Sequence, residues 1–152
     1  MKTKVALVTV GASGIGRASC EALAAAGATV EVADIDEHGG RATATSMVES
    51  GVFQRLDVSR ENDWEQGMQN TIDRLDRMHI VVNSAGIGFT GQVENIEMEA
   101  WNSIVAGYLT GTMLACKHAI GTIKAFGRGG SIINISSIGG QRRGGQSSLL
   151  RN

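Results

Sequence analysis

The feature that most constrains the fold is a buried strand that ends in a glycine turn and passes directly into an alanine-rich helix. Residues 6–18 read ALVTVGASGIGRA, with glycine at positions 11, 14 and 16. Because glycine has no side chain, the backbone N–H groups of the turn and the positive end of the helix can approach a phosphate. The pattern predicts a pyrophosphate-binding turn, and hence a dinucleotide, at this point of the chain.

An acidic residue follows the second expected strand at a distance typical of a ribose ligand. The strand at 29–33 leads into Asp34, eighteen residues after Gly16. A carboxylate at this offset accepts hydrogen bonds from the ribose hydroxyls of the adenosine. It would also repel a 2′-phosphate, and no basic residue lies between Gly11 and Gly16, so we predict NAD in preference to NADP. The alternative is a glycine-rich turn that binds nothing, because the spacing is not G-x-G-x-x-G.

Short β-branched segments alternate with longer helical patterns along the rest of the chain. This alternation is typical of βαβ units around a parallel sheet, so we predict an α/β, Rossmann-like doubly wound fold. Residues 1–140 would form one domain and residues 141–152 an irregular tail. The expected strands are 5–9, 29–33, 52–56, 80–83 and 131–136, and the expected helices are 15–26, 37–49, 60–77 with Ser59 as N-cap, and 98–126.

The last of these helices carries a long apolar stripe with helical spacing. We expect this stripe to form a core face against the sheet. Its members are Trp101, Ile104, Val105, Tyr108, Leu109, Thr112, Met113, Cys116, Ile120 and Ile123.

Composition excludes several classes of partner. The net charge is −1 and no basic block occurs, so nucleic acid is not an expected partner. No apolar run reaches the length of a membrane span and the first residues do not resemble a secretory leader, so we expect no membrane partner and a cytoplasmic location. Cys20 and Cys116 are expected to be buried thiols. Because His38, His79 and His118 are scattered along the sequence, no metal site is predicted.

Three further motifs carry a resemblance to a known family. LDVS at 56–59, NSAG at 83–86 and SIINISS at 131–137 follow the glycine turn in order. From Thr3 to about Gly140 the chain resembles the short-chain dehydrogenases/reductases. The resemblance implies five strands ordered 3-2-1-4-5, with Asp57 and Val58 beside the adenine of NAD(H). The cofactor-binding residues that it implies are Gly11, Ser13, Gly14, Ile15, Gly16, Asp34, Asp57, Val58, Asn83, Ala85 and Gly86.

The family transfers hydride between a nicotinamide and a small carbonyl or secondary alcohol. A tyrosine supplies the proton, a lysine four residues later lowers the pKa of the phenol, a serine positions the carbonyl oxygen, and an asparagine supports a water relay. Ser137 matches the catalytic serine, whereas Tyr108 occupies the asparagine position and is expected to be a core or pocket aromatic. The family tyrosine would fall near Leu150, where none exists, and the lysine would fall beyond Asn152.

These departures leave two functional interpretations. The chain is a truncated oxidoreductase of this family that is catalytically incompetent alone, or a non-catalytic NAD-binding remnant or interaction module. The helix at 98–126 is a candidate homo-oligomer interface, since this helix often builds the subunit interface in the family.

Two details of the chain carry structural expectations of their own. Val10 replaces the first glycine of the family turn, and a positive φ there would cost on the order of 1–3 kcal/mol. The strand at 131–136 would form an apolar edge of the sheet.

Overall fold

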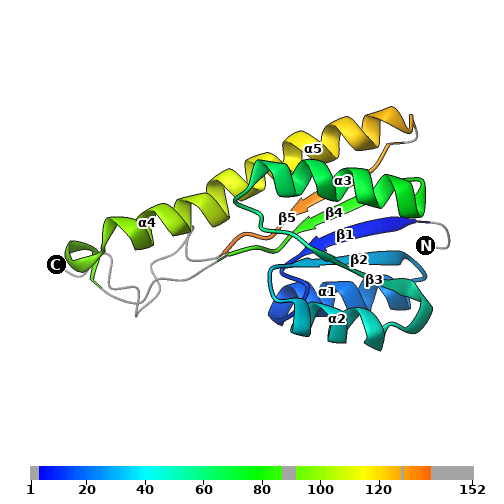
Figure 1. Cartoon of the computed structure of the whole chain (residues 1–152), viewed down its shortest axis with the longest axis horizontal. Coiled ribbons are helices and arrows are strands. Elements are labelled where there is room, and N and C mark those ends of the chain that lie inside the picture. The colour runs from blue at the N-terminus through cyan, green and yellow to red at the C-terminus, as the bar shows by residue number, and fades with distance from the viewer. Residues whose placement is uncertain (1–3, 87–91, 128, 138–152) are drawn as a thin grey trace.

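The protein is built on a five-stranded parallel sheet with helices on both faces (Figure 1). The computed structural model describes residues 4–86, 92–127 and 129–137. The strand order is β3-β2-β1-β4-β5, which confirms the predicted doubly wound fold and its order. The strands are β1 (Val5–Thr9), β2 (Thr29–Asp34), β3 (Gly51–Arg55), β4 (Ile80–Asn83) and β5 (Ser131–Asn134).

The helices form two layers. α1 and α2 cover one face of the sheet, and α3 and α5 cover the other (Figure 1). The α-helices are α1 (Gly14–Ala25), α2 (Glu37–Ser46), α3 (Glu61–Leu75), α4 (Met98–Val105) and α5 (Gly111–Ala125), joined by short 3₁₀ turns at Val48–Ser50 (η1) and Val93–Asn95 (η2) and by a π-helical segment at Ala106–Thr110 (η3).

The predicted cap of α3 is wrong by one residue. The N-cap is Arg60, and its side chain makes no capping hydrogen bond. The hydroxyl and backbone N–H of Ser59 instead donate to Asp57 Oδ1, at 2.7 and 2.9 Å. Because Ser59 is used in this local turn, the helix begins later than the sequence pattern indicates.

Strands that are covered on both faces explain the continuous apolar runs in the sequence. All five residues of β1 are buried, and Ala6, Leu7 and Val8 are fully inaccessible to solvent. Alternate residues enter two separate clusters, one beneath α1 and α2 and the other beneath α3 and α5. Such burial of both faces is characteristic of parallel sheets, and it fixes the carboxyl ends of the strands at one edge.

The expected core stripe of the last long helix is largely wrong. The residues that α5 buries are Gly111, Leu114, Ala115, Ala119 and Ile123. Three of these residues are small, and a Cβ at Gly111 would lie 3.1 Å from a methyl group of Val58, so the helix packs closely there. Of the ten predicted stripe residues only Ile123 is buried, and Trp101, Tyr108, Leu109, Met113 and Ile120 are exposed.

The two cysteines are free, and their environments differ. Cys20 is buried in α1, and burial raises the pKa of its thiol to about 12. This prediction is confirmed. Cys116 is only partly buried on α5, so the same prediction is wrong for that residue.

The strand β5 forms an edge of the sheet, as predicted. Ile133 and Ile135 are exposed by 44% and 39%, so apolar side chains reach solvent there. Regular structure ends at Asn134 and not at residue 136, although the N–H of Ile135 still donates to Asn83 O at 2.9 Å. The predicted tail at 141–152, with Leu150 and Asn152, lies outside the described residues.

A buried carboxyl group lies inside the layer between the sheet and α3. Glu31 of β2 is fully buried, and its Oε2 is hydrogen-bonded to the hydroxyl of Thr71. The same hydroxyl is 2.9 Å from Gly67 O and has only one proton, so both contacts are hydrogen bonds only when the carboxyl group donates. Burial raises the pKa of Glu31. A protonated Glu31 satisfies both observations.

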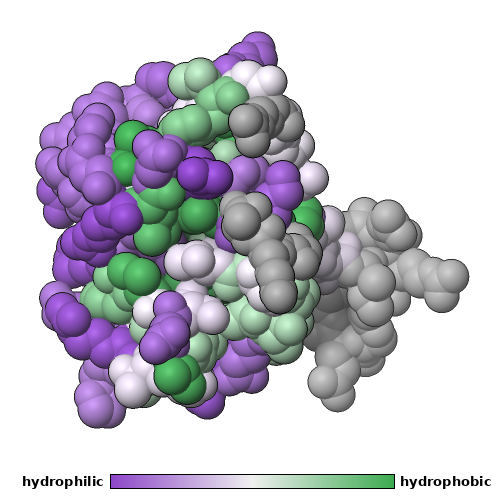
Figure 2. Space-filling model, turned by 90° about the vertical axis from the view of Figure 1, so that its right-hand side faces the viewer, coloured by the Kyte–Doolittle hydropathy of each residue, from purple (hydrophilic) through white to green (hydrophobic). Residues whose placement is uncertain are grey.

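Figure 2 shows the end at which the strands begin, where hydrophilic residues surround smaller hydrophobic areas. Within the described ranges, no helix combines the length and the hydrophobicity that crossing a bilayer requires. The candidate site lies at the other end, where the strands finish.

Candidate functional site

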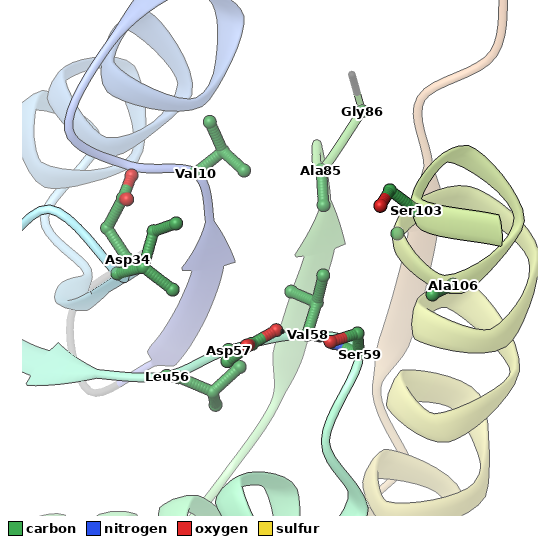
Figure 3. Close-up of a pocket in the computed structure, with 12 residues that line it drawn as sticks. Val10, Asp34, Leu56, Asp57, Val58, Ser59, Ala85, Gly86, Ser103 and Ala106 are labelled. Atoms are coloured by element: carbon green, nitrogen blue, oxygen red, sulfur yellow. Dashed lines mark hydrogen bonds between the residues drawn. The ribbon is translucent and has the colours of Figure 1, made fainter. Parts of the chain in front are cut away.

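A cleft of about 510 Å³ opens at the carboxyl ends of β1, β3 and β4. Figure 3 shows three walls: the end of β1 with Asp34, the segment after β3, and the end of β4 facing the helix of α4. The carboxyl edge of an open parallel sheet is where ligands bind in doubly wound folds. The lining residues are Val10, Asp34, Ile35, Leu56, Asp57, Val58, Ser59, Ala85, Gly86, Ser103, Ala106 and Gly107.

The glycine turn lies beside this cleft and is shaped by close backbone packing. A Cβ at Gly16 would lie 2.0 Å from Val10 O, and one at Gly11 would lie 2.6 Å from a methyl group of Val32. Gly14 has a φ of +52° and open space where a Cβ would be. The N-cap of α1, Ser13, makes no side-chain capping bond. The turn therefore offers the uncapped amino end of a twelve-residue helix to a ligand.

Val10 adopts the positive φ whose cost the sequence analysis considered for this position. Its φ is +53°, a left-handed conformation that a β-branched residue rarely takes. Its carbonyl oxygen is the group that excludes a side chain at Gly16, so the close packing of the turn holds Val10 in this conformation.

Asp34 connects the end of β2 to the glycine turn. Its Oδ2 accepts a hydrogen bond from Ala12 N at 3.0 Å, and its Oδ1 accepts one from Asp36 N at 2.9 Å. The side chain is buried at the cleft wall. Each carboxylate oxygen has a further lone pair that can accept from a ligand. Asp34 thus fixes the turn and faces the cleft.

The segment after β3 forms a wall that is held by its own hydrogen bonds. Asp57 N donates to Asp63 Oδ2 at 2.9 Å, and the indole of Trp64 donates to Val58 O at 2.9 Å. Together with the bonds from Ser59 to Asp57, these contacts fix the positions that the resemblance places beside an adenine.

The end of β4 is tied to the end of β1. The hydroxyl oxygen of Thr9 accepts from Ser84 N at 3.0 Å and from Ala85 N at 3.2 Å. Asn83 is not among the residues that line the cleft, and its side-chain amide donates to Asn134 Oδ1 at 2.6 Å. Among the described residues, Asn83 Oδ1 is a buried acceptor without a hydrogen-bond partner.

Tyr108 lies against the mouth of the cleft and is not a core residue. It is 46% exposed, and a Cβ at Gly86 would lie 2.4–2.5 Å from its ring and hydroxyl. It belongs to the π-helical segment η3, and π-bulges often mark functional sites. The prediction of a pocket aromatic fits this position, whereas the prediction of a core aromatic does not.

The structure brings together some of the residues expected from the sequence. Asp34, Asp57, Val58, Ala85 and Gly86 line one cleft, and Gly11, Ser13, Gly14, Ile15 and Gly16 form the adjacent turn. Ser137 follows β5, is exposed, and is not part of the cleft lining.

Sequence reasoning missed the wall that the long helix contributes. Ser103, Ala106 and Gly107 line the cleft from α4 and η3, and Ile35 forms the rim beside Asp34 with 62% exposure. In the sequence, the small residues at 106 and 107 are the only local sign that this helix lies close to the cleft. The apolar stripe around them indicated a core face instead.

Comparison with known proteins assigns the family. The model of the short chain dehydrogenase family matches residues 4–149. The chain belongs to this family. It is 36% identical over 137 residues to a 3-alpha-(or 20-beta)-hydroxysteroid dehydrogenase of Mycobacterium bovis, covering 90% of this chain and 52% of that protein.

Two further relatives have similar coverage. Trans-4-hydroxycyclohexanecarboxylate dehydrogenase of Sinomonas cyclohexanicum is 38% identical over 146 residues, covering 90% of this chain and 56% of that protein. For a 3-beta-hydroxysteroid dehydrogenase of Comamonas testosteroni the identity is 36% over 138 residues, with 91% and 54% covered. The chain therefore spans about half the length of these curated relatives, and it belongs to an oxidoreductase family that uses NAD(P).

Proposed function

We propose that this chain binds NAD(H) at the carboxyl edge of its sheet and does not transfer hydride by itself. The observation that carries the proposal is Asp34, whose carboxylate both faces the cleft and accepts a hydrogen bond from Ala12 N in the glycine turn. One residue thus connects the expected ribose position to the expected pyrophosphate position.

The shape of the turn fits a dinucleotide. The open space at Gly14 and the uncapped amino end of α1 suit a pyrophosphate, which the backbone N–H groups of the first helical turn would bind. Asp34 would accept from the ribose hydroxyls through its remaining lone pairs, and Val58 and Ile35 would supply apolar surface for the adenine. The nicotinamide, when bound, supplies or accepts the hydride.

Charge favours NAD over NADP. Among the residues that line the cleft in the described part of the chain, Asp34 and Asp57 are acidic and none is basic. A 2′-phosphate would be placed near a buried carboxylate with no cation to neutralise it, which costs affinity.

Hydride transfer needs a proton donor that this chain does not present. Tyr108 is the only tyrosine in the 152 residues, and the fourth residue after it is Thr112. The nearest lysine along this helix, Lys117, is paired with Glu61 on α3. A phenol is a weak acid–base catalyst at neutral pH unless a neighbouring cation stabilises its anion.

Titration with NAD⁺ and NADP⁺ tests the binding proposal. D34N keeps the size of the side chain and removes its charge, and D36N is the matched control two residues away, because asparagine can still cap α2. Loss of hydrogen bonds to a charged acceptor costs about 1.5–3 kcal/mol, so D34N should weaken NAD⁺ binding about 10- to 150-fold. We expect D36N to change it less than about threefold. Equal affinities in D34N and the parent would refute the proposed ribose contact.

Turnover is a separate measurement. We expect no NADH oxidation above background with a panel of small ketones and diones. If turnover occurred and Y108F abolished it, Tyr108 would be the proton donor and the non-catalytic part of the proposal would be wrong. In the whole protein, we propose hydride exchange between NAD(H) and a small carbonyl or secondary alcohol.

A second proposal concerns association of identical chains through the helix formed by α4, η3 and α5. Leu109, Met113 and Trp101 are exposed by 70%, 52% and 49% on this helix, and the edge strand β5 is also apolar. Exposed apolar surface of this kind favours an interface. Light scattering after size-exclusion chromatography should give the mass of a dimer, and M113E should lower it; a monomeric parent would contradict the proposal.

A further inference from the structure

A cluster of one histidine and two glutamates joins the helices α3 and α5 on the face of the sheet away from α1 and α2. Glu61 and Glu65 lie one turn apart on α3, and His118 lies on α5. One ligand atom from each of the three side chains lies within 4.8 Å of the other two. The cleft at the carboxyl edge contains none of these residues, so the cluster is separate from the dinucleotide site.

The imidazole is positioned as a ligand. His118 is mostly buried, its Nε2 is inaccessible to solvent, and in the described structure this atom has no hydrogen-bond partner. It lies 3.4 Å from Glu61 Oε1. A buried ring nitrogen that faces a carboxylate oxygen without a hydrogen bond can be satisfied by a proton or by a metal ion.

We propose that Glu61, Glu65 and His118 bind a divalent transition-metal ion such as Zn²⁺. Imidazole nitrogen and carboxylate oxygen are ligands that Zn²⁺ takes, with bonds of about 2.0–2.2 Å, and three protein ligands leave a fourth position for water. Tetrahedral bonds of that length place ligand atoms about 3.3–3.5 Å apart. Both glutamates are exposed, so their side chains can close from the present spacing to this one.

Lys117 is the competing cation. Its ammonium group is hydrogen-bonded to Glu61 Oε1, and Glu65 also faces it. A metal ion would replace this ammonium at Glu61. The competing interpretation is an ion-pair cluster that only joins the two helices. A metal site predicts tighter Zn²⁺ binding when Lys117 is removed, whereas an ion-pair cluster predicts no such gain.

The first test is calorimetric titration of the whole chain with Zn²⁺, with visible absorption of Co²⁺ as a check on nitrogen and oxygen ligation. We expect one ion per chain. H118Q and E65A should each weaken binding more than about tenfold, because each removes one of three ligands. H38Q and D73A are matched controls, since they remove an exposed histidine on α2 and an exposed carboxylate on α3, and they should leave affinity unchanged. Circular dichroism verifies folding.

The second test uses K117M. Removal of this exposed ion pair frees Glu61 for the metal ion and should tighten Zn²⁺ binding up to about fivefold. Unchanged or weaker binding in K117M would remove Glu61 from the ligand set and overturn the three-residue site. Wild-type affinity in H118Q, or no heat with Zn²⁺ at 100-fold excess over protein, would overturn it as well.

Discussion

The strain at Val10 gives a prediction whose sign can be measured. At an ordinary negative φ, glycine is less stable than alanine by about 0.5–1 kcal/mol, because it loses more conformational freedom on folding. At the φ of +53° found here, an L-residue carries a penalty of about 1–2 kcal/mol that glycine does not. The second effect exceeds the first, so we expect V10G to be more stable than V10A by about 0.5–1 kcal/mol.

V10A is the matched control because it removes the valine side chain and keeps the strained backbone. The side chain of Val10 lines the cleft, and its loss would otherwise be confused with the relief of strain. For a chain of this length, 1 kcal/mol shifts the melting temperature by about 2–4 °C. Thermal unfolding of the two variants should therefore place V10G about 1–4 °C above V10A.

Titration of the variants with NAD⁺ shows how much the strain at Val10 weakens the affinity for NAD⁺. If all of the 1–2 kcal/mol were released on binding, V10G would bind about 5- to 30-fold more tightly. Close packing at Gly16 already holds the turn in this conformation, so we expect V10G to change the affinity less than about tenfold. The substitution should act mainly on the melting temperature. A V10G variant that melts below V10A would refute the strain argument.

Three further substitutions test the packing around the site. E31Q should gain stability relative to the parent as pH rises from the ordinary glutamate value of 4.5 to the raised pKa of Glu31, because in this window the unfolded parent chain ionises at residue 31 while the buried carboxyl group stays protonated. Urea unfolding at several pH values measures this difference, and a pH-independent difference would contradict it. T9V leaves two backbone N–H groups without their acceptor and should cost about 1–3 kcal/mol of unfolding free energy, measured against the conservative T9S. G16A would place a Cβ 2.0 Å from Val10 O and should lower stability by about 1–3 kcal/mol in the same assay, and an unchanged midpoint would argue against a rigid turn.

The sheet was predictable from sequence because its strands are buried on both faces. The runs at β1 and β4 have their predicted bounds, since each is a short apolar segment rich in valine that is followed by a glycine-containing turn. The sequence marked Val10 as a position where a positive φ would be costly, and the structure shows that the residue adopts it.

The long helix was not predictable to the same degree. Periodicity identified apolar residues three and four apart, but it could not show that Gly111, Ala115 and Ala119 give the closer approach to the sheet. Large apolar side chains such as Leu109 remain outside. Packing geometry, and not hydrophobicity alone, decides which stripe is buried.

Clusters that depend on tertiary packing were invisible for a related reason. Glu61 and His118 are far apart in sequence and belong to different helices, so their spacing carries no signal of contact. The scattered histidines therefore predicted no metal site, whereas the fold places one of them beside two carboxylates.

Asp34 links cofactor preference to the structure of the turn. Asp34 accepts from both Ala12 N and Asp36 N, and asparagine keeps only one acceptor oxygen for these two N–H groups, so D34N should change stability and preference together. Ile35 lies at the rim with 62% exposure, and its side chain has no hydrogen-bonding group that a substitution would remove. I35R should therefore raise the affinity for NADP⁺ relative to NAD⁺ while the melting temperature stays within about 2 °C of the parent, with I35L as the control for size. An unchanged ratio of the two dissociation constants in I35R would mean that the 2′-position of the ribose does not face this rim.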